Sequence, residues 1–150
     1  MRLEEAIQSR GFKNQKQKSA LNIMYTAYQV KTRISQALKD FGLTPEQYNV
    51  LRILKGKHPE QMCVRDIAQR LIERSSNVPR ILDRLEIKKL VKRGQSGEDK
   101  RETVIILSQA GINLLASSSG AIDQANEQIT DMGEQDLIQL NDLLDRYLKN

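Results

Sequence analysis

Two runs that favour β-strands flank a polar segment in the second half of the chain. The runs are residues 90–93 and 103–107, which are rich in aliphatic and β-branched side chains. The segment between them, residues 94–101, contains two glycines and ends in Asp99-Lys100-Arg101. A polar, glycine-containing connection of this kind predicts a β-hairpin with a long, basic tip.

Two short helical patterns stand directly before this hairpin. Residues 64–71 carry apolar side chains at three- and four-residue steps, which predicts a brief helix. Residues 75–90 predict a longer one. Its buried face is expected to hold Val78, Ile81, Leu82 and Leu85. Two helices followed by a two-stranded wing form a winged helix-turn-helix, whose second helix enters the major groove of DNA.

Two further helices are predicted on the amino-terminal side. Residues 21–41 carry an apolar stripe, and Gly42 is expected to end that helix in the left-handed conformation. The next helix begins at Thr44-Pro45-Glu46-Gln47, which supplies a hydroxyl cap, a proline at the first helical position and a capping-box glutamine. It is expected to stop near Gly56.

Two helices are predicted after the hairpin. Ser108 is expected to cap the first, but Gly120 and the serines at 117–119 weaken this helix, so a kink is expected there. The second follows Gly133. Its apolar positions are Leu137, Leu140, Leu144, Tyr147 and Leu148.

These patterns predict a mainly α protein with a small β-wing, built as a single domain over residues 1–150. The winged helix-turn-helix core covers residues 44–107. The terminal helices, in residues 19–42 and 108–150, carry more apolar surface than this core can cover. They are expected to form the dimerisation region of a homodimer, since a closed two-fold dimer is the commonest oligomeric arrangement.

Charge is distributed unevenly along the chain. Residues 55–101 contain thirteen Lys and Arg against seven Asp and Glu, a net charge of +6. Residues 108–150 contain two against seven, a net charge of −5. A basic middle beside an acidic tail predicts a module that binds a polyanion, here double-stranded DNA, attached to a part with another role.

The composition excludes several other classes of protein. One cysteine and one histidine, Cys63 and His58, cannot supply a structural zinc site, and no cofactor is expected. The two residues are five apart, yet no orienting partner supports nucleophilic catalysis. No apolar run is long enough for a membrane span, and residues 1–18 lack the apolar stretch of a secretory signal. A cytoplasmic protein without a membrane partner is expected.

Three segments resemble the MarR (multiple antibiotic resistance regulator) family of transcriptional regulators. Residues 75–86 look like that family's recognition helix. Residues 90–93 with Asp99-Lys100-Arg101 look like its wing, including the Asp-x-Arg signature, and residues 104–111 resemble the following strand-to-helix passage. With the flanking helices the similarity covers residues 21–148. The resemblance implies a homodimeric regulator, expected to be a repressor that binds an inverted-repeat operator and not an enzyme.

The candidate DNA contacts lie on the recognition helix and at the wing tip. Each has a physical reason: short polar side chains at a helix start reach phosphates or base edges, and an arginine fork can read guanine. The candidates are Ser75, Ser76, Asn77, Arg80, Arg84, Lys100 and Arg101. The resemblance further implies that Asp99 orients Arg101 through a salt bridge. The alternative for Arg80 and Arg84 is a solvated face paired with Asp83 and Glu86.

Three positions depart from the family pattern. Pro79 replaces a usual Thr or Ser, and proline is tolerated only in the first turn, which favours Ser76 over Ser75 as the helix cap. Lys89 replaces the usual glycine, so it must adopt a left-handed conformation or let the helix end differently. Cys63 replaces the usual hydroxyl cap of the short helix.

A regulatory ligand is the least defined expectation. Family members often respond to small aromatic or anionic effectors, and Tyr25, Tyr28, Tyr48 and Arg52 are candidate pocket residues. The favoured alternative is that these four are ordinary core and interface residues. Redox sensing through Cys63 is not expected, since sensing cysteines of this family usually lie near the first helix. A winged-helix module that binds only protein and a small helical enzyme remain as alternatives.

Overall fold

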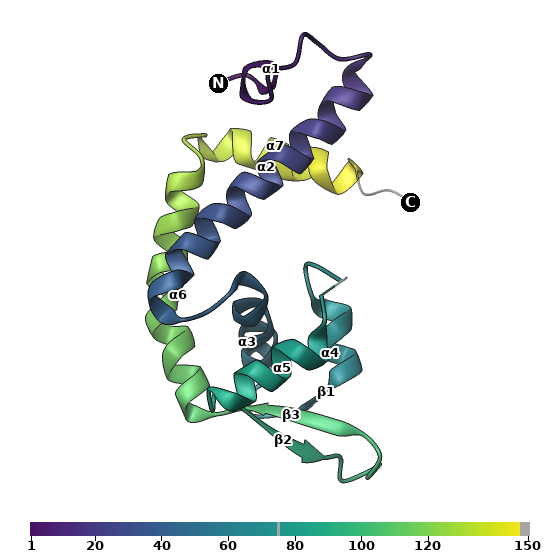
Figure 1. Cartoon of the computed structure of the whole chain (residues 1–150), viewed down its shortest axis with the longest axis vertical. Coiled ribbons are helices and arrows are strands. Elements are labelled where there is room, and N and C mark those ends of the chain that lie inside the picture. Colours follow the sequence, from purple (N-terminus) through teal and green to yellow (C-terminus); the bar gives the residue numbers. More distant parts are fainter. Residues whose placement is uncertain (75, 148–150) are drawn as a thin grey trace.

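The computed structural model describes residues 1–74 and 76–147, which fold into a winged head and a set of long helices (Figure 1). Of the predicted residues, Ser75 and Leu148 lie outside the described part. The head contains α3 (Pro45–Lys57), β1 (Met62–Cys63), α4 (Val64–Arg70), α5 (Val78–Ile87), β2 (Val91–Gln95) and β3 (Thr103–Leu107). The other helices are α1 (Leu3–Ala6), α2 (Gln15–Leu38), the 3₁₀ turn η1 (Lys39–Phe41), α6 (Gln109–Ile129) and α7 (Glu134–Tyr147). The predicted winged-helix fold class is confirmed.

Local signals in the sequence determine where α2 ends and α3 begins. Gly42 has a φ of 66°, a left-handed conformation that costs glycine little, so the predicted stop is confirmed. The predicted capping box is also present: the Thr44 hydroxyl accepts the Gln47 N–H at 3.1 Å, and Gln47 Oε1 accepts the Thr44 N–H at 3.3 Å. The helix α3 continues to Lys57, one residue beyond the predicted stop at Gly56.

The helix α5, the predicted recognition helix, spans Val78–Ile87 and is shorter at both ends than the predicted residues 75–90. Asn77, not Ser76, is its cap, because the Asn77 side-chain oxygen accepts the Arg80 N–H at 3.2 Å. Pro79 is then the second helical residue, where the missing N–H would have had no intrahelical partner. At the other end Lys89 adopts a φ of 61°, the left-handed alternative expected for this position.

The predicted hairpin is confirmed and gains a third strand. β2 and β3 pair antiparallel from Val91 opposite Leu107 to Gln95 opposite Thr103. β1 pairs with the other edge of β3, which gives the strand order β1-β3-β2. β1 was not predicted, because a two-residue strand has no periodicity of its own.

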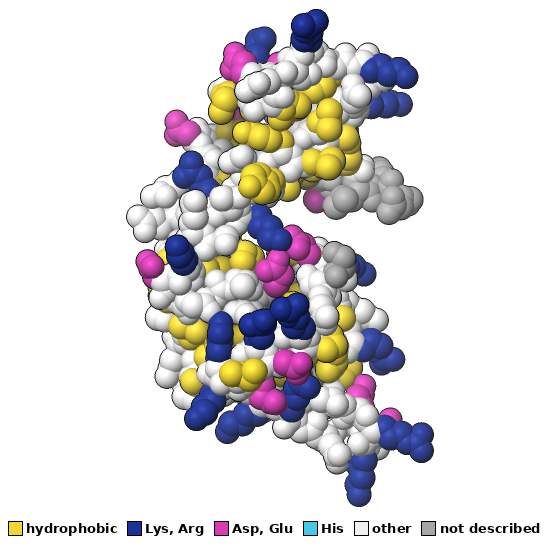
Figure 2. All heavy atoms as spheres, in the orientation of Figure 1, with side chains coloured by type: hydrophobic (Ala, Val, Ile, Leu, Met, Phe, Trp, Pro, Cys, Tyr) yellow, Lys and Arg dark blue, Asp and Glu magenta, His cyan; other side chains and the backbone are white. Residues whose placement is uncertain are grey.

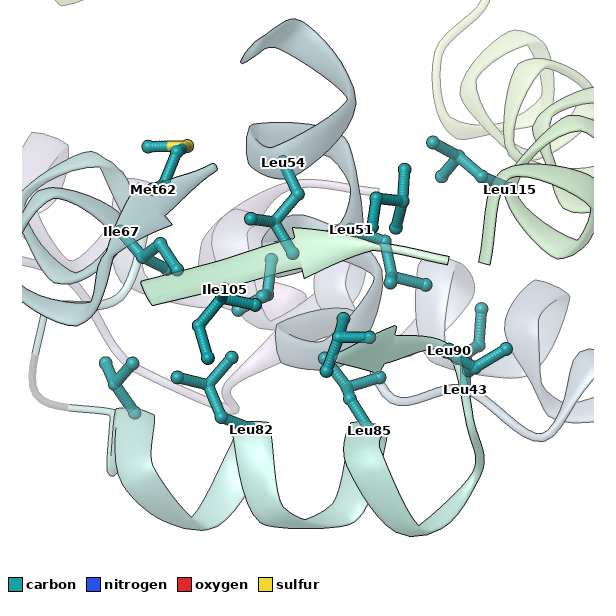
Figure 3. Packing of buried hydrophobic residues seen from close by; sticks show 14 of the residues in the cluster. Leu43, Leu51, Leu54, Met62, Ile67, Leu82, Leu85, Leu90, Ile105 and Leu115 are labelled. Carbon is teal, nitrogen blue, oxygen red and sulfur yellow. The ribbon is translucent and has the colours of Figure 1, made fainter. Parts of the chain in front are cut away.

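The head is held together by an aliphatic core (Figure 3). Side chains from α3, α4, α5 and β3 converge there, and each of the following is at most 1% exposed: Leu51, Leu54, Ile67, Leu82, Leu85 and Ile105. Burying one such side chain stabilises the fold by roughly 1.5–3 kcal/mol. The core therefore fixes the inner face of α5, and this determines which of its side chains point outward.

The helix α6 runs as one helix and is anchored to the head at its start. Ser108 caps it, as predicted, accepting the Gly111 N–H at 3.0 Å while donating to the Lys89 carbonyl at 2.7 Å. The helix is continuous across residues 117–120, where a kink is expected from the sequence. The three serines there donate their hydroxyls to carbonyls three residues earlier, at 2.8–3.1 Å, so they are accommodated within the helix. Figure 1 shows α6 extending from the head to pack beside α2.

Within the described residues, no helix is both long and apolar enough to cross a membrane.

Candidate nucleic-acid interface

The outer face of α5 presents two exposed arginines. Arg80 and Arg84 are one helical turn apart, while Val78, Leu82 and Leu85 on the opposite side are buried. Neither arginine forms an ion pair within residues 1–74 and 76–147. The guanidinium groups are therefore available to an external ligand.

The acidic residues of α5 are bound by an arginine of the wing. Arg93 on β2 pairs through Nη2 with Asp83 Oδ1, and its Nε lies 3.5 Å from Glu86 Oε2. Arg93 Nη2 also donates to the Pro79 carbonyl at 3.4 Å. The alternative pairing of Arg80 and Arg84 with these acids is not the arrangement found in the structure.

Sequence reasoning did not single out Arg93, although a usable signal exists. Side chains alternate between the two faces of a strand, so Arg93 lies on the same face of β2 as the buried Val91. That face is directed toward α5, and the neighbouring Lys92 lies on the other. Once the position of α5 is known, strand alternation identifies Arg93 as the basic residue of β2 that faces it.

A second cation binds the acids at the start of α3 and before α5. Lys31 on α2 contacts Glu46 at 2.8 Å and Glu73 at 2.7 Å. The hydrogen bonds to Glu46 and Glu73 raise the pKa of the Lys31 ammonium, and the hydrogen bond from Lys31 lowers the pKa of the Glu46 carboxyl. The Lys31 ammonium and the Glu46 carboxylate are therefore both charged at neutral pH.

An open groove connects these features. It lies between the start of α3 and the first turns of α5, and its lining is Thr44, Glu46, Gln47, Glu73, Ser76, Asn77, Arg80, Ile81 and Arg84. The predicted residues Ser76, Asn77, Arg80 and Arg84 are thus brought together. Asn77 uses its side-chain oxygen as the helix cap, and Ser76 is half-buried. Figure 2 shows Lys and Arg side chains gathered over the head.

The wing tip carries exposed Lys100 and Arg101, held by a compact turn. Ser96 Oγ accepts the N–H groups of Glu98 and Asp99, at 3.3 and 3.4 Å. Asp99 Oδ1 accepts the backbone N–H of Arg101 at 2.9 Å. Among the contacts of the described chain, Asp99 touches the Arg101 backbone and no salt bridge joins the two side chains. Asp99 thus shapes the turn that carries Arg101.

The four candidate effector residues lie on two helices and differ in burial. Tyr25 and Tyr28 lie on α2, half-buried and exposed respectively, while Tyr48 and Arg52 lie on α3. Tyr48 packs against the hydrophobic core, and Arg52 is exposed. None of the four lines the groove beside Arg80 and Arg84.

Cys63 occupies the cap position of α4 without donating or accepting a capping hydrogen bond. Partial burial raises the pKa of its thiol, and the nearby Asp66 carboxylate opposes the thiolate further. His58 lies at the end of α3. A thiol with a raised pKa is mostly protonated at neutral pH, which disfavours both nucleophilic and redox roles.

Comparison with known proteins agrees with the resemblance in the sequence. A family model for the MarR family matches residues 41–102, which include α3, α4, α5 and most of the wing. The HTH-type transcriptional regulator MhqR of Bacillus subtilis is 27% identical over 131 residues, covering 83% of this chain and 86% of that protein.

Solved structures share the same architecture. The S. aureus MepR–DNA complex matches with a TM-score of 0.76 at 27% identity, covering 87% of this chain and 95% of that one. Bordetella bronchiseptica BpsR, solved in work on the regulation of its DNA binding by 6-hydroxynicotinic acid, matches with a TM-score of 0.81. At 17% identity, over 93% of this chain and 99% of that one, it supports the fold alone. The family model over residues 41–102, the curated relative and the shared winged-helix architecture all show that this chain is similar to DNA-binding transcription regulators of the MarR type.

Proposed function

We propose that this protein is a homodimeric repressor that reads an inverted-repeat operator with α5. The observation that carries the proposal is the pair of exposed arginines, Arg80 and Arg84, whose direction is fixed by the buried face of the same helix. Arginine reads guanine O6 and N7 bidentately, and a spacing of one turn lets both side chains enter one major groove. MepR, a relative of this chain, was solved in complex with DNA.

The wing supplies the second contact of the proposed interface. Lys100 and Arg101 are exposed at the hairpin tip, at the end of the head that Figure 1 shows farthest from α2. A basic tip held beside a helix in the major groove reaches adjacent phosphates or the minor groove. Ser76 and Asn77, at the start of α5, are placed to contact phosphates.

The dimer is proposed from apolar side chains that one chain leaves uncovered. Within its described residues α7 has no buried side chain, and Met24 and Tyr28 on α2 are 68% and 66% exposed. Figure 2 shows apolar side chains gathered on the helical part of the molecule. The exposed apolar residues of α7 are Ile138, Leu140, Leu143, Leu144 and Tyr147. Contiguous exposed apolar surface marks an interaction site, here residues 19–42 and 108–150 of a second copy.

Release by a small aromatic or anionic effector completes the proposed function. The DNA binding of BpsR, which shares this fold, is regulated by 6-hydroxynicotinic acid, an aromatic carboxylic acid. Tyr25, Tyr28, Tyr48 and Arg52 lie on the two helices, α2 and α3, that connect the proposed dimer region to the head. A screen for compounds that dissociate the DNA complex tests this part directly.

The wing can be tested through salt dependence. Arg101→Ala is expected to weaken DNA binding and to flatten the fall of log K with log salt by about 0.9 for each phosphate that is no longer neutralised. The measurement is a titration of labelled duplex at several salt concentrations. Arg10→Ala is the matched control, since it removes the same charge from an exposed position outside the head. Unchanged affinity in a folded Arg101→Ala protein would remove the wing from the mechanism.

A further inference from the structure

The carboxylates nearest the recognition arginines are bound by cations from other elements. Asp83 and Glu86 are bound by Arg93 of the wing, and Glu46 and Glu73 are bound by Lys31 of α2. These ion pairs use one Arg and one Lys to engage four acids. Arg80 and Arg84, which lie among these acids, take no part in them.

Without those cations, the acids would compete for Arg80 and Arg84. Asp83 is three residues after Arg80 on the same helix, a spacing at which side chains meet. Glu46 and Glu73 line the same groove as both arginines. A carboxylate released from its cation would therefore find an arginine within reach, and it would also repel an approaching phosphate.

We propose that Arg93 and Lys31 are positioning residues that keep Arg80 and Arg84 unpaired for DNA by holding the surrounding carboxylates. This inference rests on the proposed function and adds a role for two residues outside the recognition helix. Arg93 acts from the wing and Lys31 from α2, so the two cations bind different pairs of acids. Both residues affect DNA binding indirectly, because they neutralise the carboxylates around Arg80 and Arg84.

The side chains have the exposure that this role requires. The side chains of Asp83 and Glu86 are 60% and 48% exposed, so they would remain hydrated after the removal of Arg93. An exposed ion pair contributes little to folding stability. Removing the cation should therefore change DNA binding far more than it changes the stability of the fold.

A double-mutant cycle on Arg93 tests the proposal. The variants are Arg93→Ala, Asp83→Asn with Glu86→Gln, and all three substitutions combined, each titrated with the duplex selected by the wild type at one fixed low salt concentration. Arg93→Ala is expected to weaken binding about tenfold, because free carboxylates then face the phosphates. The neutralised pair should bind within about twofold of wild type, and the triple variant should recover to within about threefold.

Two other roles for Arg93 predict different results. If Arg93 only tethered the wing to α5, neutralising the two acids would weaken binding as much as Arg93→Ala, and the triple variant would not recover. If Arg93 contacted a phosphate, Arg93→Ala would weaken DNA binding by the same factor in the wild type and in the variant with Asp83 and Glu86 neutralised. Either result overturns the proposal.

Controls separate charge, folding and the underlying function. Lys92→Ala removes a charge from the other face of the same strand. It should reduce DNA affinity by the same factor whether Asp83 and Glu86 are charged or neutralised by substitution. Arg93→Lys should bind close to wild type, and Arg93→Gln replaces Arg93→Ala if urea unfolding shows that the latter does not fold. If the wild type enriches no sequence in a selection from random duplexes, the proposed function fails and this inference fails with it. If the wild type does bind a selected sequence but the effects of the Arg93 and acid substitutions simply add, this inference alone is overturned.

Lys31 provides an independent second cycle on the other side of the groove. Lys31→Met removes the ammonium while keeping most of the stem, and Glu46→Gln with Glu73→Gln neutralises its partners. Weakened binding in Lys31→Met should be restored when both acids are neutralised. If these ion pairs only linked α2 to the head, Lys31→Met and the double glutamate substitution would weaken DNA binding equally. The combined variant would then show no recovery.

Discussion

Gly111→Ala is expected to lower the free energy of unfolding by about 3 kcal/mol, the upper part of the usual range for overpacking. A Cβ at position 111 would lie 2.3 Å from the Leu90 carbonyl oxygen and 2.8 Å from Leu107 Cδ1. The closer atom belongs to the backbone, which cannot rotate away. The start of α6 would have to move from the turn between α5 and β2, which would break the hydrogen bond from Ser108 to that turn.

The same helix offers a matched control. Gly120 is exposed, and a Cβ there would meet no atom within 4 Å. Gly120→Ala is expected to stabilise the protein by about 0.5–1 kcal/mol through helix propensity. Urea unfolding of both variants checks the pair. If Gly111→Ala were as stable as Gly120→Ala, the close approach of α6 to the head would be wrong.

Replacing Arg80 or Arg84 with Ala is expected to cost about 1–3 kcal/mol of binding free energy on the selected site, if the side chain reads a base. That cost corresponds to roughly 5- to 150-fold in Kd. The sequence preference should weaken at one base-pair position in each half-site. Binding to random DNA should fall much less, since the remaining phosphate contacts survive.

The affinities of each variant for the selected duplex and for random duplex, measured at one salt concentration, show whether Arg80 and Arg84 read bases or hold phosphates. A residue that only holds a phosphate would, when replaced, weaken binding to both duplexes similarly and leave the preference unchanged. Equal reductions in affinity for both Arg80→Ala and Arg84→Ala would therefore contradict base reading. We expect base reading for at least one of the two.

The features predicted correctly are those that depend on residues close together in the sequence. The capping box at Thr44, the glycine stop at Gly42 and the β-branched run of β3 all depend on local backbone chemistry, so they could be found without a structure. The family resemblance of the recognition helix and wing then indicated the fold class. The roles of the candidate DNA-binding residues stay predictions.

The features that were missed or mistaken depend on tertiary contacts. β1 exists only because Met62 and Cys63 pair with β3, which lies far later in the chain. Three polar residues precede α5, and the path of the turn determines that Asn77 is the cap. The weak helix propensity of residues 117–120 does not interrupt α6, because this helix packs along both α2 and the head. The Arg93 pairing required the wing to be folded against α5.

Selection of bound sequences from a pool of random duplexes is the most direct test of the central claim, that a two-fold dimer reads DNA with α5 and the wing. The account predicts enrichment of an inverted repeat whose half-site centres lie about one helical turn, 10–10.5 base pairs, apart. The complex should contain two protein chains for each duplex. A single unrepeated half-site would contradict the two-fold dimer, and no enrichment at all would contradict sequence-specific DNA reading by this chain.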